Sequence, residues 1–186
     1  MDNNNVQNVT AGKPFEGGAV FYAPLGTTIP TDALTELDAA FENAGYISED
    51  GVVNTNTPTT QTTKAWGGDI VLSIQDEKTD TFSTVLIESL NVDVLKAYFG
   101  DENVTGTLAD GITITVNSKE LPEKAWVIDM IMRNGALKRV VIPRGKVTTT
   151  DEVTYVDNEA VGYGITITAY PDASGNTHYE YIKAAS

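Results

Sequence analysis

Apolar side chains alternate with hydroxyl side chains along several short stretches of the chain. The segments Gly111–Val116 (GITITV) and Gly164–Tyr170 (GITITAY) place isoleucine or valine at every second position, with threonine between them. Successive side chains of a β-strand point to opposite faces of a sheet, so this period of two predicts strands with one apolar and one polar face. In the first segment we expect Ile112, Ile114 and Val116 to point inward.

A strong hairpin signal lies in the second half of the chain. Asn134-Gly135 separates two apolar runs, Ala125–Arg133 and Leu137–Ile142. Both turn residues tolerate a positive φ, so the pair predicts a β-hairpin closed by a type I′ turn. The first run is apolar at consecutive positions, which indicates a strand covered on both faces. We expect Trp126 of this strand to lie in the core.

A second hairpin is predicted from Asp69–Gln75 and Asp80–Glu88, with its turn at Asp76–Thr79. Polar and apolar residues alternate along it, and acidic residues stand at both ends. One face of this hairpin is therefore expected to meet water. The polar candidates for that face are Ser73, Gln75, Thr81 and Ser83.

The stretch Asn54–Lys64 consists almost entirely of Asn, Thr and Gln. It has too little apolar surface to pack in a core, so we expect residues 49–68 to form a long protruding loop or arm. Trp66 follows it as a candidate hinge anchor or interface contact. Residues 1–16 are expected to form an N-terminal arm. The candidate contact residues are Asn54, Thr55, Asn56, Thr57, Pro58, Thr59, Thr60, Gln61 and Trp66.

Two helices are predicted. Thr31–Ala44 places Leu34, Leu37 and Phe41 on one face at helical spacing, with Thr31 or Asp32 as the N-cap. Asn91–Phe99 is shorter, with Asn91 as N-cap and a glycine directly after it. The expected fold is mainly β (α+β), with roughly eight to ten strands. It is an antiparallel sandwich or partly open barrel with a flanking helix and a second short helix, in one domain spanning 1–186.

The chain is strongly acidic, with a net charge of -14 over 186 residues. Such a chain repels nucleic acid and anionic lipid, which argues against a DNA-binding surface. It has no cysteine, which excludes disulfides, thiolate catalysis and cysteine-bound zinc. Neither a signal peptide nor an apolar stretch long enough to cross a membrane is visible, so no membrane partner is expected.

Catalytic signatures are lacking. His178 is the only histidine, and no Gly-x-Ser-x-Gly element accompanies it. We therefore expect a histidine on a strand surface. Acidic pairs such as Asp157 and Glu159 lie outside any EF-hand spacing, which favours a solvated surface over a calcium site. The expectation is a protein that is not an enzyme, with no catalytic residue, no metal and no cofactor.

Four segments together carry a resemblance to a known family. They are Gly18–Gly51, KAWGGD at Lys64–Asp69, LNVDVLKAYFGDENVTG at Leu90–Gly106, and ITAYPDASGNTHYEY at Ile167–Tyr181. In these segments and in the order of its elements, the chain resembles the major tail proteins of long-tailed bacteriophages, especially those infecting Gram-positive actinobacteria. The resemblance covers nearly the whole chain.

The resemblance implies a structural subunit with two packed sheets and a flanking helix. Such subunits form rings, typically hexamers, that stack into a tube around a β-barrel, and a long loop, here Asn54–Lys64, reaches the next ring. It implies as partners further copies of the chain, the tape measure protein, the tail terminator and the distal tail or baseplate proteins. DNA would pass through the lumen without specific binding, and we expect the polar face of the second predicted hairpin, with Ser73, Gln75, Thr81 and Ser83, to line that lumen. The location implied is the virion tail, assembled in the host cytoplasm.

Some members of that family carry a C-terminal immunoglobulin-like domain, which we do not expect here because the chain stops at Ser186. Two other functions stay open. One is a capsid decoration or baseplate protein. The other is a carbohydrate-binding β-sandwich, for which aromatic residues are available.

Overall fold

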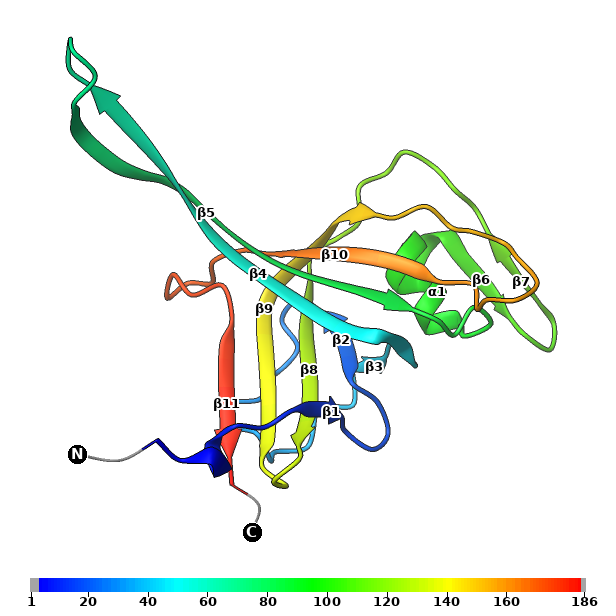
Figure 1. Cartoon of the computed structure of the whole chain (residues 1–186). Coiled ribbons are helices and arrows are strands. Elements are labelled where there is room, and N and C mark those ends of the chain that lie inside the picture. Colours follow the sequence, from blue (N-terminus) through cyan, green and yellow to red (C-terminus); the bar gives the residue numbers. More distant parts are fainter. Residues whose placement is uncertain (1–3, 185–186) are drawn as a thin grey trace.

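The computed structural model describes residues 4–184 and is built mainly of β-strands (Figure 1). In this range there is one α-helix, α1 (Val92–Phe99), and there are two short 3-10 turns, Val6–Asn8 and Asp101–Asn103. The strands are β1 (Gly12–Pro14), β2 (Val20–Pro24), β3 (Glu42–Asn43), β4 (Ile47–Lys64), β5 (Ile70–Leu86), β6 (Val104–Thr107), β7 (Gly111–Ile114), β8 (Lys124–Met132), β9 (Leu137–Thr150), β10 (Tyr163–Ala169) and β11 (Tyr179–Lys183). The expected β-rich α+β class is confirmed.

Nine strands form one antiparallel sheet in the order β3-β2-β8-β9-β10-β5-β4, with β1 added beside β8 and β11 beside β9. The long strand β9 belongs to two parts of this sheet. It pairs with β11 at Leu137–Val141 and with β10 at Gly145–Thr150. Figure 1 shows β9 changing direction between these two stretches, so the sheet folds over on itself. The result is an open sandwich of two layers.

The main core lies between the two layers. Trp126 of β8 is 1% exposed, and its ring lies 5.3 Å from that of Tyr22 on β2. Ile165 and Ile167 of β10 belong to the same buried cluster. A Cβ at Gly145 would lie 2.6 Å from Trp126 Cδ1 and 2.8 Å from an Ile167 methyl carbon. Glycine therefore lets β9 pass between these side chains, and the prediction that Trp126 is a core residue is confirmed.

Strand β8 is covered on both faces, as predicted, since Lys124–Asp129 are all buried. The segment 25–41 lies over the face opposite the main core. The buried Arg139 of β9 holds this segment, because its Nη1 donates to the carbonyl oxygens of Asp32 at 3.2 Å and of Thr35 at 2.7 Å. Its other nitrogens pair with both carboxylate oxygens of Asp129 at 2.6 and 2.8 Å.

The predicted helix at Thr31–Ala44 is wrong. The predicted N-cap contact is present, since Asp32 Oδ1 accepts the backbone N–H of Leu34 at 2.7 Å and that of Thr35 at 2.6 Å. The helix does not continue, because the carbonyl oxygens of Asp32 and Thr35 accept from Arg139 instead of from the next helical turn. The segment then ends in β3, which pairs with β2.

The second predicted helix is confirmed as α1. The side chain of Asn91 accepts the N–H of Asp93 at 3.0 Å, and Gly100 ends the helix with a φ of 97°. Helix α1 buries Val94, Leu95 and Ala97, which satisfies its apolar face.

The first alternating segment differs from expectation. Its strand β7 pairs only with β6, in a separate two-stranded sheet. Ile112 is half-buried, but Ile114 is exposed and Val116 is 79% exposed. The prediction that all three point inward is wrong, because this small hairpin lies at the edge of the molecule (Figure 1) and of the three side chains Ile112 alone packs against the buried core. The expected N-terminal arm is partly ordered: β1 pairs with β8 at Met130–Met132, and residues 1–3 lie outside the described range.

The Asn134-Gly135 hairpin is present, joining β8 to β9. The N–H of Gly135 donates to the carbonyl oxygen of Met132 at 2.8 Å, and the N–H of Met132 donates to the carbonyl oxygen of Ala136 at 2.7 Å. Gly135 has a φ of 85°, whereas Asn134 does not have a positive φ. The predicted type I′ turn is therefore wrong. The loop has three residues and needs glycine only at its last position.

Replacing Gly135 with valine should destabilise the fold by roughly 1–3 kcal/mol, because a β-branched residue is strained at positive φ. Urea denaturation measures the loss. Gly135→Asn serves as the matched variant and should lose less, since asparagine tolerates the left-handed region. Equal stability of the valine variant and the parent chain would contradict the assignment.

Candidate functional site

Strands β4 and β5 extend far beyond the body as a two-stranded ribbon (Figure 1). The pairing runs from Val52 opposite Thr84, near the body, to Lys64 opposite Ile70, near the tip, and it is interrupted by β-bulges. Residues 53–79 are all exposed. We call residues 57–79 the distal ribbon. The polar stretch Asn54–Lys64 does protrude as predicted, but as a strand and not as a loop. Its β-branched threonines suit cross-strand pairing even without a core beneath them.

The tip of the ribbon is a hydrogen-bonded turn at residues 65–69. The N–H of Ala65 donates to the carbonyl of Asp69 at 2.7 Å, and that of Gly68 donates to Ala65 at 3.0 Å. Gly67 and Gly68 have φ values of 117° and 102°, which only glycine adopts readily. Trp66 stands at this tip and is fully exposed. The predicted turn at Asp76–Thr79 is wrong, since these residues continue β5.

A bulge at Asp76 divides the four polar candidates between the two faces of the ribbon. Thr81 and Ser83 are opposite Thr55 and Val53, which are odd-numbered positions of β4. Ser73 and Gln75 are opposite Thr62 and Thr60, which are even-numbered. The extra residue shifts the alternation, so Ser73 and Gln75 lie on the other face from Thr81 and Ser83.

Thr81 and Ser83 belong to a larger surface rich in hydroxyl groups. The Ser83 hydroxyl lies 2.9 Å from that of Thr166, and Thr148 and Thr168 are linked at 2.7 Å. Their neighbours Phe82, Ile165 and Ile167 point the other way, into the core. We call the surface formed by Thr81, Ser83, Thr148, Thr166 and Thr168 the hydroxyl face. Sequence alternation indicated its polar residues, but the pairing that assembles them is visible only in the structure.

A buried carboxylate fixes the root of the ribbon. Asp80 is 1% exposed and accepts from Asn54 at 2.8 Å and from the Thr177 hydroxyl at 2.6 Å, and it bonds His178 Nδ1 at 2.5 Å. The His178 ring also packs edge-on against Phe82, 5.2 Å away. The prediction that His178 lies on a strand surface is therefore wrong, since its side chain is 16% exposed and the residue precedes β11. No local sequence signal could reveal a partner 98 positions away.

Asp80 is held in its charged form. Burial raises its pKa, but hydrogen bonds from Thr177, Asn54 and His178, together with attraction to His178, outweigh burial and leave the pKa below its usual value. The root of the ribbon is thus tied by a charged hydrogen-bond network to the segment that leads into β11.

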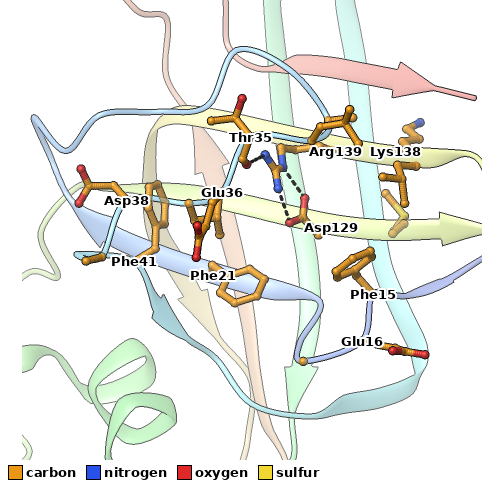
Figure 2. A pocket seen from close by; sticks show the side chains of 17 residues that line it. Phe15, Glu16, Phe21, Thr35, Glu36, Asp38, Phe41, Asp129, Lys138 and Arg139 are labelled. Atoms are coloured by element: carbon orange, nitrogen blue, oxygen red, sulfur yellow. Dashed lines mark hydrogen bonds and ion pairs between the residues drawn. The ribbon is translucent and has the colours of Figure 1, made fainter. Parts of the chain in front are cut away.

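A pocket of about 620 Å³ lies between segment 33–41 and the outer face of β2, β8 and β9. Figure 2 shows Phe15, Phe21 and Phe41 around it, beside the Asp129–Arg139 pair. Leu34 and Leu37, predicted to form the apolar face of a helix, line it from a loop. Glu16, Glu36 and Asp38 also line the pocket. Asp129 and Arg139 at its inner end are paired with each other. The pocket is therefore an apolar site bordered by acidic side chains.

Among residues 4–184, no group of His, Asp and Glu side chains is arranged to hold a metal ion. In the same range no helix is long and apolar enough to cross a membrane. The prominent features are a free ribbon, an uncharged hydroxyl face and an apolar pocket, which are features of contact surfaces.

The comparison with protein families agrees with these features. The sequence model of one family, described as phage tail tube protein, matches residues 1–186. The chain belongs to the phage tail tube protein family. This tail tube subunit is therefore a structural component of the phage virion. The subunit assembles with further copies of itself and with other tail proteins. No curated protein sequence matches it.

The charged network at Asp80 of the tail tube subunit predicts a pH dependence. Asp80→Asn removes an acceptor from a buried site and should destabilise the fold by roughly 1–3 kcal/mol at neutral pH. Because the folded-state pKa lies below the unfolded value of about 3.9, the stabilisation by Asp80 is complete above that pH and is lost as pH falls through the folded pKa. The stability gap between parent and variant should therefore narrow below about pH 4.

Thermal unfolding followed by circular dichroism from about pH 5 to about pH 3 tests this dependence. The matched control is Asp76→Asn, an exposed carboxylate on the same strand, which should change stability little. A gap that stays constant across this range would contradict the charged state of Asp80.

Proposed function

We propose that the subunit polymerises as stacked rings, hexameric by resemblance, and that the resulting tube is the conduit for DNA during ejection. The observation that supports this most directly is the free ribbon. Among residues 4–184, no strand pairs with the part of β5 beyond Thr81 on the edge that β10 occupies nearer the body, and none pairs with the outer edge of β4. A lone two-stranded ribbon is marginally stable in water, and open edges favour pairing with another chain.

Pairing between identical copies satisfies both edges at once. The edge of β4 and the edge of distal β5 are different surfaces, so contact between them is head-to-tail and closes into a ring when the rotation allows. A ring of ribbons forms a continuous barrel without free edges. The whole chain acts as a single tail tube domain in this arrangement, with no catalytic role.

The hydroxyl face is proposed to line the lumen. It belongs to the same layer as the root of the ribbon, and its threonine and serine side chains offer phosphate no cation. Lys146, which is opposite Thr168, is paired with Glu120 at 2.7 Å. With a net charge of -14, a wall of this kind lets a polyanion slide without binding.

The remaining partners follow from the role. The tape measure protein fills the tube during assembly, and the tail terminator and the distal tail or baseplate proteins close its ends. Assembly takes place in the host cytoplasm, and the finished subunit resides in the virion tail.

Shortening the ribbon tests polymerisation. Residues 58–78 are replaced by Asn-Gly, which joins the directly paired Thr57 and Thr79 through a two-residue turn. The excised residues are exposed, so the circular dichroism spectrum and melting temperature should stay close to those of the parent. Electron microscopy at high protein concentration should show tubes only for the parent chain. Normal tubes from the shortened chain would refute assembly through the ribbon.

Lysine substitutions test the lumen. Thr81→Lys with Thr168→Lys should leave tubes intact but slow DNA ejection, because each added cation holds a phosphate and releases counterions. The slowing should fade as salt is raised. The control carries the same two charges on the opposite ribbon face, as Thr60→Lys with Thr62→Lys. Ejection at the parent rate in low salt would contradict the lumen assignment.

A further inference from the structure

The tip of the ribbon presents a side chain that its own chain leaves uncovered. Trp66 is fully exposed although it is the largest apolar side chain of the region, and the hydrogen-bonded turn at residues 65–69 holds it on an ordered support. Next to it, Ile70 and Val71 are 62% and 63% exposed. An ordered apolar patch of this kind marks a contact with another molecule.

The pocket lined by Phe15, Phe21 and Phe41 has matching properties. Its volume of about 620 Å³ lies within the roughly 300–1,000 Å³ typical of pockets that enclose small organic groups, so one indole ring fits. The carboxylates of Glu36 and Asp38 supply acceptors for the indole N–H, which normally finds a partner when buried.

The tip and the pocket lie at opposite ends of the subunit. Figure 1 shows the ribbon tip at one end and the turn between β8 and β9 at the other, and the pocket residues Met130, Leu137 and Lys138 adjoin that turn. From Thr81 to Ile70 the ribbon spans eleven steps, which at about 3.3 Å each gives a reach of roughly 36 Å. The reach of the ribbon therefore exceeds the diameter of a small domain, about 30 Å, so the tip of one copy is long enough to meet a neighbouring copy.

The charges of the two surfaces permit the contact. Lys64 and Asp69 are the charged residues among 53–75, so this part of the ribbon is neutral in a chain of net charge -14. Elsewhere two acidic surfaces would repel each other. The neutral tip can therefore approach a pocket that carries acidic side chains without the repulsion expected between two acidic surfaces.

We propose that Trp66 of one subunit inserts into the Phe15–Phe21–Phe41 pocket of a second copy in the next ring. The proposal rests on the proposed function and names the contact between rings. Each copy gives one tip and receives one, and because the two surfaces differ, the contact repeats without closing. Stacking then extends the tube one ring at a time.

Disulfide trapping tests the contact directly, because the chain has no cysteine of its own. Ala65→Cys, beside an intact Trp66 in the exposed tip turn, combined with Leu34→Cys at the partly exposed wall of the pocket, should give a ladder of covalent oligomers when assembled tubes are oxidised. Either single variant gives dimers at most. The control pair is Ala65→Cys with Leu108→Cys, a position away from the pocket that is more exposed than Leu34 (62% against 49%), and it should give no ladder.

Truncation of the tip provides an independent measurement. Trp66→Ala should leave the monomer's melting temperature unchanged and raise the protein concentration needed for tube growth at least about tenfold, as loss of a buried aromatic anchor does. Trp66→Phe should recover part of the loss. Tubes that form normally from the alanine variant, or a ladder with Leu108 but not with Leu34, would overturn the docking while leaving the proposed function intact. Parent protein that forms no tubes would refute the proposed function itself.

Discussion

The contact between Trp126 and the backbone of Gly145 is the constraint on which the two-layer arrangement depends. The indole N–H donates to the carbonyl oxygen of Gly145 at 3.3 Å, at the place where β9 leaves one layer and enters the other. A side chain at that position would separate the layers. Because β9 is shared, the pocket in one layer and the ribbon in the other hold a fixed relation, as a repeating unit requires.

Two charged groups position the parts that reach outward. Arg139, held by Asp129, fixes the segment over the pocket through carbonyl oxygens, and Asp80 fixes the root of the ribbon through three side chains. Each group is buried and fully engaged, so its removal leaves unpaired partners. The subunit thus uses buried polar networks to orient the pocket and the ribbon, while its apolar core supplies stability.

Local patterns allowed much of the fold to be predicted. Alternation found β10, the Asn-Gly pair found the hairpin between β8 and β9, and the Asn91 cap found α1. The errors come from long-range contacts. Arg139 diverts carbonyl oxygens that a helix at 31–44 would need, and cross-strand pairing carries β5 through a turn-like sequence. The protrusion of the polar stretch was predicted, but the pocket and the Asp80 network join residues too distant for any pattern.

The separation between ribbon and body has a consequence for how such a chain can diverge. Since the distal ribbon buries nothing against its own body, its length and the stability of the fold are independent variables. Alternation of side chains allows each strand to change only in steps of two residues, or about 7 Å, if the faces are to keep their identity. The reach of the ribbon can therefore change only in discrete increments, without any change to the core.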